Sequence, residues 1–152
     1  MKKIIITGGD CSGKTFLANS IAKAYNNVVY LGFRGQNIKE LNPFIFDQVT
    51  KETDLIIIDD VNEKSFQIFE LLIYTKRIVV NKRGYSAKVY KIPDLIFTFS
   101  GSVEYFRNYG VSFSMRCKFI RTWIDPDGVS GNRIFMSEEV KFFKELQPTI
   151  LS

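Results

Sequence analysis

The sequence predicts an α/β protein with a mostly parallel sheet of about five strands, flanking helices and an inserted β-hairpin. Three short apolar runs rich in β-branched residues, 3–7, 28–32 and 55–59, are typical of strands buried on both faces. Two other segments, 15–25 and 64–74, place apolar side chains at helical spacing. Alternation of strands with helices indicates a parallel sheet whose faces are covered by helices.

The second half of the chain adds two more strands to this pattern. Residues 95–99 form an apolar run soon after Pro93, and residues 117–124 form a fifth run. The fifth run ends at an Asp-Pro-Asp-Gly sequence, residues 125–128, which is typical of a turn. These runs complete a predicted sheet of about five strands.

The C-terminal segment has the pattern of a helix. It begins with a serine followed by two glutamates, and these residues predict a capped helix over 137–146 that ends before Pro148. The sequence contains no internal repeat and no linker rich in proline and glycine. We therefore expect residues 1–152 to form a single domain.

One segment departs from the alternation of strands and helices. Two short strand-like runs, 78–81 and 89–92, flank residues 82–88, which include Gly84 and three cations. Short runs on either side of a glycine turn predict a β-hairpin with a basic tip. Any exposed loop carries charged side chains, so the pattern alone also fits a hairpin with no function beyond solvent exposure.

Composition limits the chemistry that the protein can perform. Its hydrophobic (45%) and charged (24%) fractions are close to globular averages, and the net charge of +5 permits a polyanionic partner without requiring one. The absence of histidine excludes activation of a nucleophile by histidine, general base catalysis by histidine and histidine metal ligands. The 14 Phe and 7 Tyr favour an aromatic core over base-stacking surfaces.

The most specific motif lies between the first strand and the first helix. Its spacing, G-x-x-x-x-G-K-[ST], is that of a Walker A phosphate-binding loop. Glycines let successive backbone N–H groups turn toward phosphate oxygens, and the N-terminus of the following helix adds partial positive charge. The residues expected to bind ATP are Gly8, Gly9, Asp10, Cys11, Ser12, Gly13, Lys14 and Thr15.

Two side chains of this loop have expected roles in catalysis and metal binding. Lys14 supplies a positive charge to the β and γ phosphates, and Thr15 offers a hydroxyl to Mg²⁺. The expected cofactors are therefore ATP and Mg²⁺. A loop of this kind between strand and helix also refines the predicted fold class to a P-loop NTPase three-layer sandwich.

Two acidic residues follow the third apolar run. The run ends in Asp59 and Asp60, as a Walker B strand does. Its carboxyl end should lie beside the phosphate loop, because ligands of such sheets bind where the strands end. Asp59 is the candidate for the Mg²⁺ shell, and Asp60 is placed to orient or deprotonate an attacking water. Alternatively, the two acids cap a following helix that begins near Asn62.

The order of these features, from residue 8 to about Phe119, resembles the ATPase domain of superfamily 3 helicases. These are AAA+-type motors found in replication proteins of small viruses and mobile elements. In that family a Walker A loop is followed by a Walker B strand, a basic hairpin, a strand that ends in a polar sensor, and an arginine. The corresponding segments here are residues 8–15, 55–60, 79–91, 93–100 and 115–117.

The resemblance implies roles for two further residues. Ser100 occupies the sensor position, at which the family has an asparagine, and Ser102 is the alternative. Arg116 resembles the arginine finger, which a neighbouring subunit places against the transferred phosphoryl group, and Arg107 is the alternative. A finger that acts between subunits implies a homo-oligomeric ring.

The resemblance also gives the basic hairpin a role. In the family this hairpin projects into the pore of the ring and contacts the backbone of the nucleic acid. The implication here is phosphate contact by Lys82, Arg83 and Lys88, with Tyr85 stacking on a base. The expected partner is single-stranded DNA or RNA.

Cysteine usage and the N-terminal residues bear on location. The chain has two cysteines, which cannot form a disulfide framework, and the apolar run after Met1 is too short for a signal peptide or a membrane span. We expect a cytoplasmic protein without a membrane partner, or one of the host cytoplasm or nucleus if the protein is viral.

Three functions remain open at this stage. The first is a Mg²⁺-dependent ATPase that forms a ring and moves on, or remodels, nucleic acid during replication. The second is a small nucleoside or nucleotide kinase, which Arg34 after the second strand permits, although we find no arginine-rich lid. The third is a binding module that is regulated by a nucleotide and turns over little of it.

Overall fold

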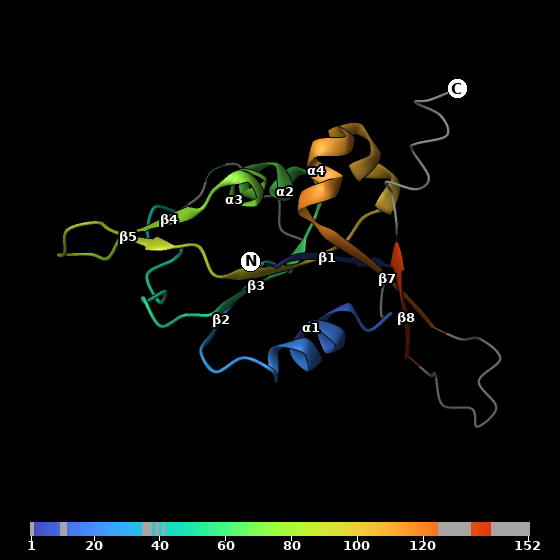
Figure 1. The fold of residues 1–152 in the computed structure, drawn as a ribbon, viewed down its shortest axis with the longest axis horizontal. Coiled ribbons are helices and arrows are strands. Elements are labelled where there is room, and N and C mark those ends of the chain that lie inside the picture. The colour runs from blue at the N-terminus through green and yellow to red at the C-terminus, as the bar shows by residue number, and fades with distance from the viewer. Residues whose placement is uncertain are drawn as a thin grey trace.

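The protein is built around a six-stranded sheet in the order β2-β3-β6-β1-β7-β8 (Figure 1). The computed structural model describes residues 2–9, 12–34, 38, 40 and 42–123, and describes 124 and 135–140 by their backbone alone. Five strands run parallel, and their pairing joins segments that are far apart in the sequence. They are β1 (Lys3–Gly8), β2 (Val28–Gly32), β3 (Leu55–Val61), β6 (Asp94–Phe99) and β7 (Lys118–Ile124).

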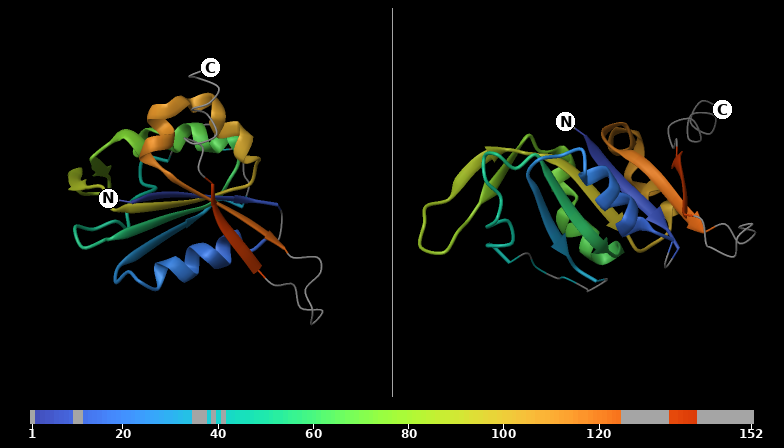
Figure 2. Two further views of the ribbon diagram at one scale, coloured as in Figure 1. Left: turned by 45° about the vertical axis from the view of Figure 1, so that its right-hand side comes forward. Right: turned by 90° about the horizontal axis from the view of Figure 1, so that it is seen from below.

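Helices cover both faces of this sheet and make three layers (Figure 2). Helix α1 (Lys14–Ala22) lies on one face. The other face carries α2 (Glu63–Phe69), α3 (Leu71–Tyr74), the 3-10 helix η1 (Val103–Tyr109) and α4 (Gly110–Arg116). The predicted α/β arrangement, a mostly parallel sheet with flanking helices, is confirmed.

The apolar core has one part on each face of the sheet. Beneath α1, Ala18 packs with the strand residues Ile4, Ile6, Ile57 and Ile96. On the other face the core is largely aromatic, as predicted, and many of its rings meet edge to face, which is a favourable arrangement of aromatic side chains. Its fully buried phenylalanines are Phe66, Phe69, Phe97, Phe99, Phe106, Phe113 and Phe119.

The predicted β-hairpin is present as a separate two-stranded sheet. Strands β4 (Arg77–Val80) and β5 (Lys88–Lys91) pair antiparallel, and the hairpin projects away from the main sheet (Figure 1). Strand β6 begins at Asp94, three residues after β5 ends. The hairpin therefore leaves the sheet at the amino end of β6.

Two expectations about secondary structure are wrong. Residues 135–140 form strand β8 (Phe135–Val140), which pairs antiparallel with β7, where a helix from Ser137 was predicted. The unpaired backbone groups at the edge of β7 offer a strand more hydrogen bonds than an isolated helical turn would make. Strand β2 is an edge strand with exposed residues, so it is not buried on both faces.

The predicted helix over 64–74 is confirmed, with an interruption at Glu70. It is divided between α2 and α3, and the N-cap of α2 is Asn62, whose side chain accepts a hydrogen bond from the Ser65 amide at 2.9 Å. The cap is thus not the acidic pair before it. Residues 141–146 of the predicted helix and the predicted turn at 125–128 lie outside the described residues.

No helix in the part of the chain that the structure describes has both the length and the apolar character needed to cross a membrane.

Candidate functional site

The glycine-rich loop, the two acids after β3 and the two candidate sensor serines gather where the parallel strands end. After β1 the chain enters α1 on one face of the sheet, whereas after β6 it enters η1 and α4 on the other face (Figure 1). Strands β1 and β6 are neighbours in the sheet, and the connections that follow them lead to opposite faces. A crevice between two such connections is where open α/β sheets bind ligands.

The glycine-rich loop connects β1 to α1 at this crevice. Gly13 is the N-cap of α1 and has a left-handed conformation with φ of 85°, which a residue without a Cβ adopts at no cost. Among the described residues no side chain caps this helix, and its first turn contains no acid. The helix start therefore presents its partial positive charge to the crevice.

Gly8 lies so close to strand β7 that no side chain fits. A Cβ added at Gly8 would meet Thr122 Oγ1 at 2.3 Å and Ser12 Oγ at 2.6 Å. These two hydroxyls are themselves hydrogen-bonded at 2.7 Å, which ties the loop to β7. Asp10 and Cys11, which the sequence places in the same loop, lie outside the described residues.

The ammonium group of Lys14 is folded back onto the loop. Its Nζ donates to the carbonyl oxygens of Gly8 at 3.0 Å and of Gly9 at 2.9 Å. The side chain thus crosses the start of the loop and is held by backbone acceptors. A phosphate group at this position could replace these acceptors with a charged partner.

Asp59 is the centre of a cluster of hydroxyl groups. Asp59 is 6% exposed, and its carboxylate accepts hydrogen bonds from Thr15 Oγ1 at 3.0 Å, from Thr98 Oγ1 at 2.5 Å and from the hydroxyl of Tyr30. These three donors come from α1, β6 and β2. The carboxyl end of β3 thus lies beside the glycine-rich loop, as its position in the sequence predicts.

The hydroxyl of Tyr30 keeps its proton over a wide pH range. Burial of this group raises the pKa of Tyr30 to about 12, and the hydrogen bond to Asp59 and the negative charge of that carboxylate add to the effect. Tyr30 is therefore a hydrogen-bond donor to Asp59 at neutral pH.

A β-bulge separates the two acids at the end of β3. The register between β3 and β6 shifts between Ile58 and Val61, and Asp60 has a positive φ of 58°. The Asp60 amide donates to Thr98 Oγ1 at 2.6 Å, so Thr98 contacts both acids. Bulges next to functional sites redirect side chains, and here Asp60 faces the same hollow as Lys14 and Thr15.

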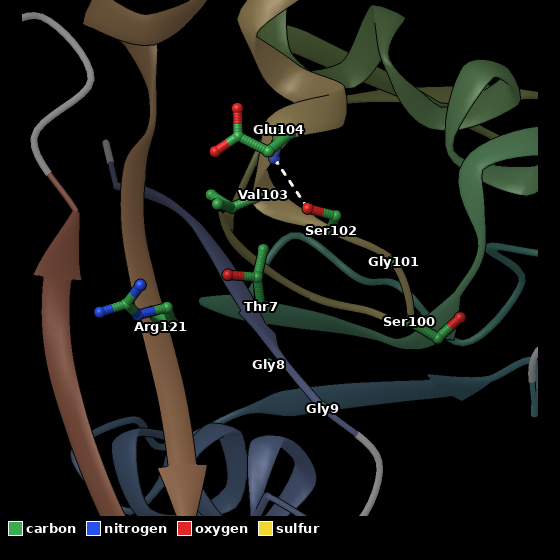
Figure 3. Close-up of a pocket in the computed structure, with 9 residues that line it drawn as sticks. All are labelled: Thr7, Gly8, Gly9, Ser100, Gly101, Ser102, Val103, Glu104 and Arg121. Carbon is green, nitrogen blue, oxygen red and sulfur yellow. Dashed lines mark hydrogen bonds between the residues drawn. The ribbon is translucent and has the colours of Figure 1, made fainter. Parts of the chain in front are cut away.

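Two hollows flank the glycine-rich loop. One, of about 460 Å³, is lined by Lys14, Thr15, Asp60 and Thr98. The other, of about 540 Å³, lies between the ends of β1 and β6 and the side of β7, and it is drawn in Figure 3. Both volumes are in the range of small-ligand sites. The second hollow is lined by Thr7, Gly8, Gly9, Ser100, Gly101, Ser102, Val103, Glu104 and Arg121.

The two serines considered for the sensor position both line the larger hollow. Ser100 Oγ donates to the carbonyl oxygen of Val61 at 3.2 Å, and the Ser100 amide donates to the same oxygen at 2.8 Å. Ser102 caps η1 by accepting from the Glu104 amide at 3.2 Å. Both hydroxyls thus have structural hydrogen bonds and also border the site.

Neither arginine considered for the finger lines the two hollows beside the loop. Arg116 lies directly before β7, at the amino end of the parallel strands, and its guanidinium lies 5.3 Å from the centre of the Tyr74 ring. The glycine-rich loop follows β1 at the opposite end of the same sheet. The alternative, Arg107, forms an ion pair with Glu104 at 2.8 Å.

The residues assigned to nucleic acid are exposed on the hairpin, away from this site. Lys82, Arg83 and Tyr85 lie in its turn, and Lys88 begins β5. The guanidinium of Arg83 lies 4.9 Å from the centre of the Phe44 ring. The hairpin and the loop are at opposite ends of the sheet, so one ligand group does not contact both.

Three members of the site were not singled out from the sequence. Tyr30, Thr98 and Thr122 contact the loop or Asp59 from three different strands. The available signal was a polar residue inside an apolar strand, as at Thr98 and Thr122. That signal became specific only once the strand order placed β6 and β7 on either side of β1.

Comparison with known proteins adds no assignment, because neither a family model nor a curated protein matches this chain.

Proposed function

We propose that this protein is a Mg²⁺-dependent nucleoside triphosphatase that uses ATP and acts on nucleic acid. One observation carries the proposal: Thr15 Oγ1 donates to Asp59 at 3.0 Å, although 44 residues separate them in the sequence. A hydroxyl and a carboxylate that lie side by side are hard oxygen ligands, which Mg²⁺ uses together with the phosphates of its substrate.

The donor set fits a magnesium ion that is shared with a nucleotide. Among the described residues no three carboxylate or cysteine side chains form a metal-binding group, so the protein supplies only part of a coordination shell. The three hydroxyls on Asp59 occupy three of about four acceptor positions of a carboxylate. The remaining ligands would be phosphate oxygens and water, and the bound ion would neutralise phosphate charge.

The other residues of the loop have complementary roles in this proposal. Lys14 exchanges the carbonyls of Gly8 and Gly9 for phosphate oxygens, and the start of α1 donates backbone N–H groups. Asp60 faces the hollow beside Lys14 and is the acceptor for the proton of an attacking water.

The hairpin supplies the proposed nucleic-acid surface. Residues 71–93 contain six cations and no acid, and the cations at its turn are exposed. Tyr85 is 75% exposed, which suits a side chain that stacks on bases. Strand β6 runs from the base of the hairpin to Thr98, so a single strand joins this surface to the nucleotide site.

The test is release of phosphate from ATP, measured with and without Mg²⁺ and single-stranded DNA or RNA. We expect release that requires Mg²⁺ and increases with nucleic acid. Asp60→Asn should lower the rate by about 10²-fold or more while nucleotide still binds, because asparagine also tolerates a positive φ but cannot take the proton. Transfer of the phosphate to an added nucleoside or nucleotide would instead identify a kinase.

A further inference from the structure

The larger hollow contains a buried hydroxyl that has no partner. Thr7 is 1% exposed, and its Oγ1 makes no hydrogen bond within the part of the chain that the structure describes. Burying an unpaired hydroxyl is unfavourable, so such groups usually have a missing ligand or water. Thr7 lines the hollow, which makes a ligand group there the natural partner.

A cationic residue lies level with Thr7 on the neighbouring strand. Thr7 of β1 and Arg121 of β7 are partners in the parallel register, so their side chains share one face of the sheet. Figure 3 shows the Thr7 hydroxyl on the side of β1 that faces β7, and the Arg121 side chain extending from β7 away from Thr7, so Arg121 would turn toward the hollow to meet a ligand. Arg121 is exposed and its guanidinium lies 5.9 Å from the centre of the Trp123 ring.

The hollow also borders the backbone that Lys14 contacts. Gly8 and Gly9 form part of its wall, and their carbonyls accept from the Lys14 ammonium. The acid in the lining, Glu104, is paired with Arg107 at 2.8 Å, so its charge is already compensated. A guanidinium, a hydroxyl donor and a nearby ammonium together suit an oxyanion such as a phosphate.

We propose that this hollow binds the terminal phosphate of the bound nucleotide, with Arg121 and Thr7 as its contacts. The inference rests on the proposed function and adds to it an arginine from the same chain. The hollow distinguishes a triphosphate from a diphosphate, because only the triphosphate places a group between Thr7 and Arg121.

The experiment compares the affinity of a non-hydrolysable ATP analogue with that of ADP, both with Mg²⁺. We expect the wild-type protein to prefer the analogue. Arg121→Ala should reduce this preference by about tenfold or more, since charge-assisted hydrogen bonds to phosphate are lost. Affinity for ADP should remain unchanged. Lys118→Ala, which removes a cation at the other end of the same strand, is the matched control and should keep the preference.

Variants of Thr7 give a second test, which separates a role in ligand binding from a role in stability. Thr7→Val removes the unpaired hydroxyl, so its melting temperature should be no lower than that of wild type, while its preference for the analogue falls. Thr7→Ser retains the hydroxyl and should retain the preference. A destabilised Thr7→Val variant with unchanged preference would contradict the proposal.

The remaining outcomes separate this inference from the proposed function. If wild type binds ADP and the analogue but Arg121→Ala leaves their ratio unchanged, the terminal phosphate does not bind here, and the proposed function still stands. If wild type binds neither nucleotide, both proposals fail. A second titration adds inorganic phosphate to the ADP-bound protein. If Arg121→Ala loses only the binding of inorganic phosphate in this titration and keeps the preference for the analogue, the hollow binds free phosphate and our assignment is wrong.

Discussion

At the scale of single residues, the site depends on hydroxyl groups as much as on charges. Asp59 is held by three hydroxyl donors from separate elements, and Thr98 contacts it while also accepting from the Asp60 amide. A buried carboxylate that accepts several hydrogen bonds is fixed in direction, which is useful for a residue that must meet a metal ion. The protein thus positions Asp59 before any ligand binds.

Tyr30 makes one of these contacts testable through pH. Its pKa is raised from about 10 to about 12 in the folded protein, so the folded state holds this proton more tightly than the unfolded state. The stabilisation is complete below pH 10 and is lost as the pH rises toward 12. Tyr30→Phe should be less stable than wild type by about 1 kcal/mol at pH 8.

The measurement is urea unfolding of both proteins from pH 8 to pH 12. The difference in stability should shrink above pH 10, because lysines and the other tyrosines titrate alike in both proteins. A difference that stays constant to pH 12 would show that the Tyr30 hydroxyl does not lose its bond to Asp59 in this range.

At the scale of elements, the loop after β1 is held against β7 by a close approach at Gly8. Gly8 has no room for a Cβ, whereas a Cβ at Gly9 would meet nothing within 4 Å. Gly8→Ala should therefore cost about 1–3 kcal/mol of unfolding free energy, since Thr122 and the loop must move apart. Gly9→Ala is the matched control and should be near neutral. Equal stability of the two variants would contradict the close approach at Gly8.

The hairpin is a second element with a separate prediction. Replacing Lys82, Arg83 and Lys88 with alanine should weaken binding to single-stranded DNA and reduce the slope of log K against log salt by about 2 units, near 0.7 for each lost phosphate contact. The control replaces Lys23, Lys51 and Lys64, which removes the same charge elsewhere. If both triple variants lower the slope equally, net charge and not the hairpin explains the binding.

Sequence patterns predicted the elements better than their arrangement. The apolar runs fixed the strands to within about two residues, and the glycine and cations at 82–88 predicted the hairpin. Strand β8 was missed because the serine and glutamates of its sequence are a local helix signal, while its partner strand is a long-range feature. The helical segment 103–116 was missed because it begins as a 3-10 helix and contains Gly110.

The sequence pointed to candidate site residues only where they belong to a short motif of adjacent positions. Lys14, Thr15, Asp59 and Asp60 follow from short motifs and strand ends. The contact of Tyr30 with Asp59 and the pairing of Thr7 with Arg121 depend on the order of the strands and their register, which no local spacing contains.

At the scale of the whole molecule, Arg116 and the glycine-rich loop lie at opposite ends of the sheet. In a ring ATPase, the arginine of one copy would meet the loop of the next copy. Arg116 lies before β7 and the glycine-rich loop lies after β1, and these neighbouring strands are parallel. Arg116 therefore cannot contact a phosphate in the loop of its own chain. If it is a finger, it must act on another copy. Two exposed apolar side chains lie close to Arg116 in the sequence or on the helix of its aromatic partner: Met115 is on α4 with Arg116, and Leu71 is on α3 with Tyr74.

Mixing variants tests this arrangement. Arg116→Ala should bind ATP but lose hydrolysis, and Lys14→Ala should not bind ATP. A mixture of the two should recover part of the activity, because an intact loop then meets an intact Arg116 on its neighbour. Arg107→Ala, mixed in the same way, tests the alternative finger. Full activity of Arg116→Ala alone would exclude Arg116 as a finger.

The most direct test of the central claim is titration of the wild-type protein and Lys14→Ala with ATP and Mg²⁺. Lys23→Ala, on the same helix, is the control for loss of charge. We expect wild type and Lys23→Ala to bind alike, and Lys14→Ala to bind about a hundredfold more weakly or not at all, because Lys14 is the cation nearest the expected phosphates. Equal affinity of Lys14→Ala and wild type would contradict a nucleotide site at this loop.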